Sequence, residues 1–107
     1  MAAAKVDASQ IKFNVDIDAG KVIGSLNGET AAFVELSVDQ KTSILNIKRT
    51  VTEEKFRGNG IAGLITKEVF DYALKQKHRV TSDCWYTAVF LKKPQNAEYN
   101  KLFQSKI

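Results

Sequence analysis

Between residues 53 and 62 the sequence reads Glu53-Glu54-Lys55-Phe56-Arg57-Gly58-Asn59-Gly60-Ile61-Ala62. Before this segment apolar residues mostly alternate with polar ones, as in strands, and after it they recur every three or four positions, as in a helix. Gly58 and Gly60 leave the backbone accessible at this junction because glycine has no Cβ. The first amides of a helix lack acceptors within the helix and carry partial positive charge, so the junction is expected to attract phosphate.

Arg57 adds a formal positive charge and a planar set of donors to this junction. The alternative interpretation is a tight turn in which the glycines only satisfy backbone geometry. The segment lacks the lysine and hydroxyl residues of a P-loop, and it lacks the glycine spacing of the dinucleotide-binding fingerprint. Both of those nucleotide-binding folds are therefore disfavoured.

Upstream of the junction the pattern predicts an antiparallel meander. Asn27-Gly28 is suited to a type I′ hairpin turn, in which both central residues have positive φ. In the fourth strand, strict alternation places Arg49 and Val51 on the same apolar face as Ile47. The four expected strands are Lys12–Ile17, Lys21–Leu26, Thr30–Val38 and Lys41–Thr52.

Downstream of the junction the spacing predicts a helix over Ile61–Gln76. Its end falls near Lys77-His78-Arg79, where cations suit the negative end of the helix dipole, and His78 is interpreted as part of a solvated helix end. Three shorter elements are expected after it: a strand at Val80–Asp83, a helix at Tyr86–Lys93 that stops near Pro94, and helical turns at Ala97–Phe103.

This order of elements predicts an α+β (mixed α/β) fold. The sheet is expected to be mostly antiparallel with one βαβ crossover, because the strand after the long helix can return parallel to the strand before it. The chain has 107 residues, 44% of them hydrophobic, which suits one globular domain. We expect that domain at residues 11–107, behind a flexible lead-in at residues 1–10, and a monomer is favoured.

Composition excludes several classes of protein. Cys84 and His78 are the single cysteine and the single histidine, so neither an internal disulfide nor the usual four-ligand zinc site can form, and no metal is expected. Apolar runs are too short to span a bilayer, and residues 1–10 lack the apolar stretch of a secretion signal. The expected location is cytoplasmic, with no membrane partner.

Charge is divided unequally along the chain. Residues 1–40 carry a net charge of −3 and residues 41–107 carry +7. A basic segment suggests an anionic partner such as nucleic acid, an acidic membrane surface or a phosphorylated cofactor, although a solvated lysine-rich surface is equally compatible. Nucleic acid is the least favoured partner because no interleaved aromatic and basic platform is present. That partner would use Lys75, Lys77, Arg79, Lys92 and Lys93.

The segment Arg57-Gly58-Asn59-Gly60-Ile61-Ala62 resembles the Arg/Gln-x-x-Gly-x-Gly/Ala loop of GNAT-type acyl-CoA N-acyltransferases, with matches at Arg57, Gly60 and Ala62. With the helix and the Cys84-Trp85-Tyr86 motif that follow, the chain is similar to small single-domain N-acetyltransferase-domain proteins over roughly residues 21–103. The resemblance implies a compact GNAT-like fold that binds acetyl-CoA or coenzyme A. The splayed strand would hold the pantetheine arm through its backbone, and the loop and helix start would hold the pyrophosphate. The implied cofactor-binding residues are Arg49, Thr50, Val51, Arg57, Gly58, Asn59, Gly60, Ile61, Ala62 and Cys84.

One departure from the family pattern concerns catalysis. Relatives usually carry a His-Thr pair on the strand before the loop and a proline shortly after it, whereas this chain has Arg49-Thr50 and Thr52. The resemblance implies an N-acetyltransferase acting on an unidentified amine. Absence of the strand histidine keeps open an alternative: a non-catalytic CoA-binding or interaction module with the same fold.

Acetyl transfer to an amine sets chemical requirements. A free lysine amine has a pKa near ~10.4 and must lose its proton, so a base or a water relay is needed. Glu35, Glu53 and Glu54 are candidate bases, although each is better explained as a solvated surface charge. Backbone amides of the splayed strand can stabilise the oxyanion, and Tyr86 is a candidate acid for the departing thiolate.

Cys84 is the alternative catalytic centre. It lies between a short strand and a helix start, where unpaired amides favour a thiolate, although the adjacent Asp83 acts the other way. Cys84 could accept the acetyl group first, line the site, or simply be a buried apolar residue. Trp85, Tyr86 and Phe90 could wall the acyl pocket or belong to the core.

Overall fold

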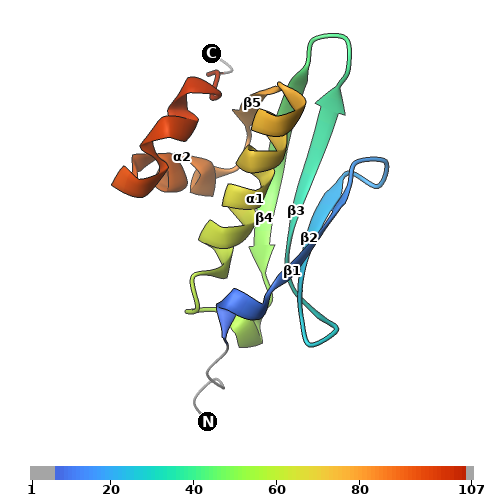
Figure 1. The fold of residues 1–107 in the computed structure, drawn as a ribbon, viewed down its shortest axis with the longest axis vertical. Coiled ribbons are helices and arrows are strands. Elements are labelled where there is room, and N and C mark those ends of the chain that lie inside the picture. The colour runs from blue at the N-terminus through green and yellow to red at the C-terminus, as the bar shows by residue number, and fades with distance from the viewer. Residues whose placement is uncertain (1–6, 106–107) are drawn as a thin grey trace.

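The computed structural model describes residues 7–105 and shows α1 lying along one face of a five-stranded sheet (Figure 1). The strands are β1 (Lys12–Asp16), β2 (Lys21–Leu26), β3 (Glu29–Asp39), β4 (Ile44–Thr52) and β5 (Arg79–Ser82). The helices are α1 (Ile61–Gln76) and α2 (Trp85–Lys92), with three 3-10 segments: η1 (Ala8–Gln10), η2 (Glu54–Phe56) and η3 (Pro94–Lys101).

The sheet has the predicted mixed topology. Its strand order is β1-β2-β3-β4-β5; the first four strands pair antiparallel, and β5 pairs parallel to β4. Helix α1 joins β4 to β5, which confirms the expected α+β class with one βαβ crossover. The β2–β3 turn is also as predicted, because Asn27 and Gly28 both have positive φ, 52° and 77°.

Some elements differ from the predicted ones in their bounds or type. Strand β4 begins at Ile44 rather than Lys41, because the Asp39 carboxylate accepts from the amides of Lys41 and Thr42 at 3.0 and 3.4 Å and closes a turn. The last helical segment is a 3-10 helix, η3, which starts earlier than expected. In the predicted lead-in, residues 1–6 lie outside the described residues and η1 occupies Ala8–Gln10.

The core forms between α1 and the sheet. The helix buries one stripe of side chains, which is the spacing that predicted it, and each buried large aliphatic or aromatic side chain contributes roughly 1.5–3 kcal/mol. The buried apolar residues of α1 are Ile61, Ile65, Val69, Phe70 and Ala73, and opposite them lie Val22, Val34, Leu36, Leu45 and Ile47.

An aromatic cluster attaches α2 and η3 to α1. Phe70 stacks on Phe90 with ring centroids 5.3 Å apart, and Tyr99 lies 5.5 Å from Phe70. The Tyr99 hydroxyl also donates to the Asp71 carboxylate of α1. Phe90 is therefore a core residue, which decides between its two predicted roles.

The prediction that His78 belongs to a solvated helix end is wrong, since only 6% of the residue is exposed. Lys77 adopts a left-handed conformation with φ of 61°, and its amide donates to the Leu74 carbonyl while the His78 amide donates to the Ala73 carbonyl at 2.8 Å. This pair of bonds is a Schellman motif, which turns the next residue back against the helix. His78 consequently packs near the Tyr72 ring, 6.3 Å between centroids.

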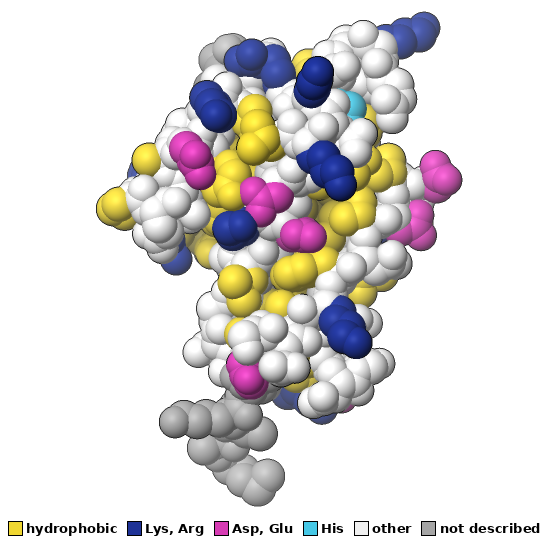
Figure 2. Space-filling view, viewed as in Figure 1, with side chains coloured by type: hydrophobic (Ala, Val, Ile, Leu, Met, Phe, Trp, Pro, Cys, Tyr) yellow, Lys and Arg dark blue, Asp and Glu magenta, His cyan; other side chains and the backbone are white. Residues whose placement is uncertain are grey.

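Basic residues gather at one end of the molecule. Lys75 and Lys77 stand at the C-terminal end of α1, and Arg79 begins β5. On the face seen in Figure 2, Lys and Arg side chains are most frequent toward the upper end, where Figure 1 places the end of α1. Within residues 7–105 no helix is both long and apolar enough to cross a bilayer.

Candidate functional site

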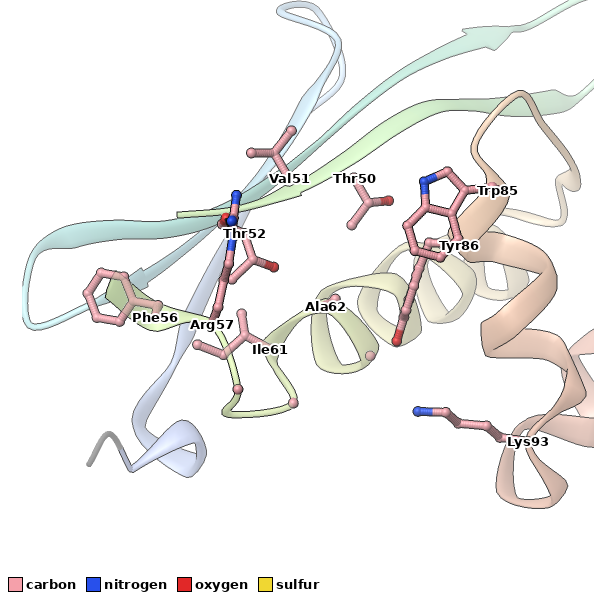
Figure 3. Close-up of a pocket in the computed structure, with 13 residues that line it drawn as sticks. Thr50, Val51, Thr52, Phe56, Arg57, Ile61, Ala62, Trp85, Tyr86 and Lys93 are labelled. Atoms are coloured by element: carbon pink, nitrogen blue, oxygen red, sulfur yellow. Dashed lines mark hydrogen bonds between the residues drawn. The ribbon is translucent and has the colours of Figure 1, made fainter. Parts of the chain in front are cut away.

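A groove of about 520 Å³ opens where the end of β4, the start of α1 and helix α2 meet (Figure 3). Side chains of β4 enter it from one side and those of α2 from the other, with the first turns of α1 between them. The lining residues are Thr50, Val51, Thr52, Phe56, Arg57, Gly58, Gly60, Ile61, Ala62, Gly63, Trp85, Tyr86 and Lys93.

Strand β4 contains a β-bulge just before it reaches the groove. Glu35 of β3 pairs with Arg49, but the next residue, Leu36, pairs with Ile47, so Lys48 has no partner on β3. The extra residue reverses the alternation of faces beyond it. The prediction that Arg49 and Val51 share the face of Ile47 is therefore wrong, and Figure 3 shows Thr50 directed toward α1 and Val51 away from it.

Arg49 consequently lies outside the groove lining. Its side chain donates to the Glu35 carboxylate at 2.6 Å and lies 5.6 Å from the centroid of the Phe33 ring. The Arg49 side chain is thus directed away from the groove, and its backbone pairs with Glu35 on β3.

The outer edge of β4 is open beside the groove. Strand β5 pairs with β4 only as far as Ile47, so in the part of the chain that the structure describes no strand covers residues 48–52 on that side. The Glu53 amide donates to Ala31 on β3 at 2.8 Å. Since backbone groups alternate in direction along a strand, the amides of Thr50 and Thr52 face the open edge. Thr50 thus presents its backbone to the groove.

The loop before α1 is held by its own side chains. Gly58 and Gly60 have left-handed φ values of 84° and 72°, and a Cβ added at either would meet no heavy atom within 4 Å. The Asn59 side chain donates to the carbonyls of Phe56 and Arg57 at 3.0 and 3.3 Å. Asn59 therefore shapes the loop through its side chain, and the glycines keep the groove side of the loop clear.

Helix α1 starts without a side-chain cap and without an acidic residue in its first turn. The Gly60 carbonyl accepts from the Leu64 amide at 3.2 Å, which begins the helical ladder. Within residues 7–105 the amides of Ile61, Ala62 and Gly63 have no backbone acceptor. These donors, at the positive end of the helix dipole, form an anion-binding arrangement beside the groove.

Formal charge at the groove has one sign. Among the described residues that line it, the charged ones are Arg57 and Lys93, and none is a carboxylate. Arg57 is anchored by a bond from its Nε to the Thr52 carbonyl at 3.2 Å, which leaves the rest of its guanidinium to other acceptors. The groove therefore attracts an anionic ligand.

Residues 22–102 match a family model described as GCN5-related N-acetyl-transferase. The chain belongs to this family. No match was found among curated proteins. The family is one of acyltransferases that generally use acetyl-CoA. Arg57, Gly60 and Ala62, on which the resemblance in the sequence rests, all line the groove.

One solved structure shares the fold over nearly the whole chain, and two others match it in part. A GCN5-like protein from Staphylococcus aureus is 17% identical, with a TM-score of 0.64, and the match covers 92% of this chain and 93% of that one. A GNAT-family protein from Staphylococcus aureus subsp. aureus is 24% identical over 56% of this chain and 51% of its own, with a TM-score of 0.49. Nourseothricin acetyltransferase is 17% identical over 54% of this chain, with a TM-score of 0.47, and this chain spans 35% of its length.

Two aromatic residues stand where α2 meets the groove of this GCN5-related fold. Tyr86 is half-buried, and its hydroxyl lies 3.4 Å from where a Cβ on Gly63 would be, which is ordinary van der Waals contact with the first turn of α1. Burial raises the pKa of the Tyr86 phenol further above neutral pH, so the group is protonated there and able to donate. Trp85 is 77% exposed and packs edge-on against Tyr86, with ring centroids 5.9 Å apart.

Cys84 lies one contact away from the groove. The residue is half-buried and outside the set that lines the groove, and its Sγ is 3.7 Å from the Oγ1 of Thr50, which does line it. Its amide donates to the Ser82 hydroxyl at 2.9 Å at the start of α2. Cys84 is thus placed beside the groove and not in its lining, and its predicted roles as nucleophile and as cofactor-binding residue stay predictions.

The three candidate bases lie away from the groove lining. Glu35 is bound by Arg49 on the far face of the sheet, and Glu53 and Glu54 are exposed after the end of β4.

Sequence reasoning did not include several lining residues in the site. Gly63 lies three residues after Gly60, on the same side of the helix start, and this spacing could have predicted that it lines the groove. Lys93 is far away in sequence and reaches the groove only in the folded chain. The others that it omitted are Thr52 and Phe56.

Proposed function

We propose that this protein binds acetyl-CoA in the groove and transfers the acetyl group to an amine. One observation supports the proposal most directly: two different sets of hydrogen-bonding groups lie in the same groove. The uncapped start of α1 and Arg57 suit phosphate, and the open backbone edge of β4 suits a ligand that contains amides. Coenzyme A joins a pyrophosphate to a pantetheine arm with two amides.

The residues of the groove fit such a ligand. The amides of Ile61, Ala62 and Gly63, with Arg57, would hold the pyrophosphate, and the absence of Cβ atoms at Gly58 and Gly60 lets phosphate approach the loop. The Thr50 backbone would hold the arm. We infer that the arm then points along β4 toward the end of the groove where Thr50 contacts Cys84.

The bound thioester supplies an activated acetyl group. In the transfer the amine nitrogen forms a bond to the carbonyl carbon, the carbon–sulfur bond breaks, the nitrogen loses a proton and the sulfur gains one. Tyr86 is the proposed acid for the sulfur, because its phenol is protonated and lines the groove. We assign the amine proton to a water relay, since the described lining residues include no carboxylate or imidazole.

A calorimetric titration with acetyl-CoA tests the binding part, with CoA and adenosine diphosphate as comparison ligands. We expect one-to-one binding in the micromolar range for both thioester and free CoA, and weaker binding of adenosine diphosphate, which lacks the arm. Absence of acetyl-CoA binding by the folded protein would reject the proposal and leave residues 57–62 as a structural turn.

A release assay tests the transfer part. Free CoA thiol is measured after acetyl-CoA is mixed with a lysine-containing peptide or an alkyl diamine, for the wild type and for Cys84→Ala. Transfer retained by Cys84→Ala excludes an obligatory acetyl-cysteine and supports direct attack by the amine. Tight acetyl-CoA binding without transfer to any amine would favour the second candidate, a non-catalytic CoA-binding module. That candidate is favoured by the strand position Arg49, whose side chain is held by Glu35.

A further inference from the structure

Lys93 brings a cation to the groove from the side opposite the loop. It follows the last residue of α2 and lines the groove together with Tyr86. Figure 3 shows its side chain extending into the groove toward the first turns of α1, on the side away from Arg57. The groove therefore has two cationic positions supplied by different elements.

The backbone of Lys93 is held in place by the junction between α2 and η3. Pro94 restricts the preceding residue to extended conformations, and Lys93 has φ of −72° and ψ of 133°. Its amide donates to the Phe90 carbonyl at 3.3 Å, and its carbonyl accepts from the Asn96 amide at 2.9 Å. The side chain of Asn96, a buried residue, donates to the Phe90 carbonyl at 2.9 Å. The side chain of Lys93 thus starts from a fixed point.

The ammonium group of Lys93 is available to a ligand. Ion pairs join Arg49 to Glu35, Lys55 to Glu29 and Lys67 to Asp71, and Lys93 takes part in none of these three. Its neighbour Lys92 is also exposed but does not line the groove. The two lysines therefore differ in position while sharing charge, length and solvent contact.

We propose that Lys93 binds the ribose 3′-phosphate of coenzyme A, so that the groove distinguishes coenzyme A from dephospho-coenzyme A. This inference rests on the proposed function. The start of α1 and Arg57 together provide the donors that a pyrophosphate needs. The remaining anionic group of the ligand is the 3′-phosphate, a phosphomonoester, and the remaining cation of the groove is Lys93, for which an ammonium is a suitable point charge.

Calorimetric titration of four proteins with two ligands tests this assignment. The proteins are the wild type, Lys93→Gln, Lys93→Arg and the matched control Lys92→Gln; the ligands are CoA and dephospho-CoA. We expect the wild type and Lys92→Gln to bind CoA about tenfold more tightly than dephospho-CoA, as a charge-assisted bond to phosphate would give. Lys93→Gln is expected to bind both ligands with the affinity that the wild type has for dephospho-CoA, and Lys93→Arg to regain the preference.

Each other outcome overturns the assignment in a distinct way. Equal weakening of both ligands by Lys93→Gln would assign the lysine to the pyrophosphate instead. Unchanged CoA affinity in Lys93→Gln would show that Lys93 makes no contact that matters for binding. If the wild type binds neither ligand, the proposed function itself fails, and that failure is distinguishable because it appears before any substitution is made.

Discussion

At the scale of single residues, Gly60 and Gly28 form a matched pair. Both have left-handed φ values, 72° and 77°, and a Cβ at either position would meet no heavy atom within 4 Å. Gly60 lines the groove, whereas Gly28 stands in the β2–β3 hairpin. Valine at either position should cost roughly 1–2 kcal/mol of stability through backbone strain. We predict that only Gly60→Val also weakens acetyl-CoA binding, by about tenfold or more.

Thermal unfolding and calorimetric titration of both glycine variants check this prediction. If the two variants lose equal stability and only Gly60→Val loses affinity for acetyl-CoA, the phosphate contact lies at the loop. If Gly28→Val loses binding to the same extent, the effect is one of global stability, and the loop has no special role.

Tyr86 carries a prediction about pH. Burial raises the pKa of its phenol, so the protonated form persists beyond the ordinary value of about 10. If Tyr86 protonates the leaving sulfur, the rate of acetyl transfer falls only as the pH rises through that raised pKa. Tyr86→Phe should lower kcat by roughly 100-fold or more and abolish that alkaline decline, while acetyl-CoA affinity stays within about threefold. A kcat equal to that of the wild type would remove Tyr86 from the chemistry.

At the scale of secondary structure, the β-bulge in β4 determines what the strand presents to the groove. Deleting Lys48 would make the β3–β4 ladder continuous, with Ile47 beside Arg49 and both on their present faces. We expect the deletion variant to fold with stability within about 1 kcal/mol of the wild type. Its acetyl-CoA affinity should fall by about tenfold because the local bend and twist that the bulge gives β4 beside the groove are lost.

Lys48→Ala is the control for the deletion, since it retains the extra residue and removes only the exposed side chain. It should bind acetyl-CoA as the wild type does in the same titration. Wild-type affinity in the deletion variant would show that the groove does not depend on the bulge.

The end of α1 provides a prediction about stability. Lys77 holds the left-handed position of the Schellman motif, where glycine is the usual residue. Lys77→Gly should relieve the strain of that conformation and raise the free energy of unfolding by about 0.5–1 kcal/mol in urea denaturation. Lys75→Gly, inside the last turn, should lower it by about 1 kcal/mol. If Lys77→Gly lowers the free energy of unfolding as Lys75→Gly does, the Lys77 side chain stabilises the fold by more than its backbone strain destabilises it.

The same two elements show what sequence reasoning could reach. The bounds of β2 and α1 follow from turn residues and apolar spacing, which are local, and they match the predictions. The bulge at Lys48 depends on how β3 pairs with β4, so alternation alone placed Arg49 on the wrong face. His78 is buried because a lysine adopts a conformation that sequence patterns assign to glycine or asparagine.

One part of the candidate site could be predicted from the sequence and another part could not. Its loop, Arg57 to Ala62, is continuous in sequence, so one motif with a helix start could reveal it. Lys93 is thirty-one residues beyond Ala62 and reaches the groove only because the Phe70–Phe90–Tyr99 cluster fixes where α2 and η3 lie. Such long-range placement has no local signature in a single sequence.

At the scale of the whole molecule, the basic end of α1 lies away from the groove and can be tested separately from it. Lys75 and Lys77 follow Gly63, a lining residue on α1, by 12 and 14 residues, so they stand about 18–21 Å along the helix from the groove. The Debye length at physiological salt is about 8 Å, which screens charges at that separation. The positive charge that first suggested an anionic partner is therefore expected to contribute little to acetyl-CoA affinity at that salt concentration.

The double variant Lys75→Gln/Lys77→Gln tests this separation by lowering the net charge of +4 by two. At physiological salt its acetyl-CoA affinity should stay within about twofold of the wild type, whereas Lys93→Gln removes one charge and should cost about tenfold. At 10 mM salt, where the Debye length grows to about 30 Å, the double variant should weaken binding as well. Equal losses for the double and single variants at physiological salt would mean that long-range attraction governs affinity. In that case the basic end of α1 would become a candidate binding surface for anionic macromolecules. Measuring RNA binding at several salt concentrations would test it.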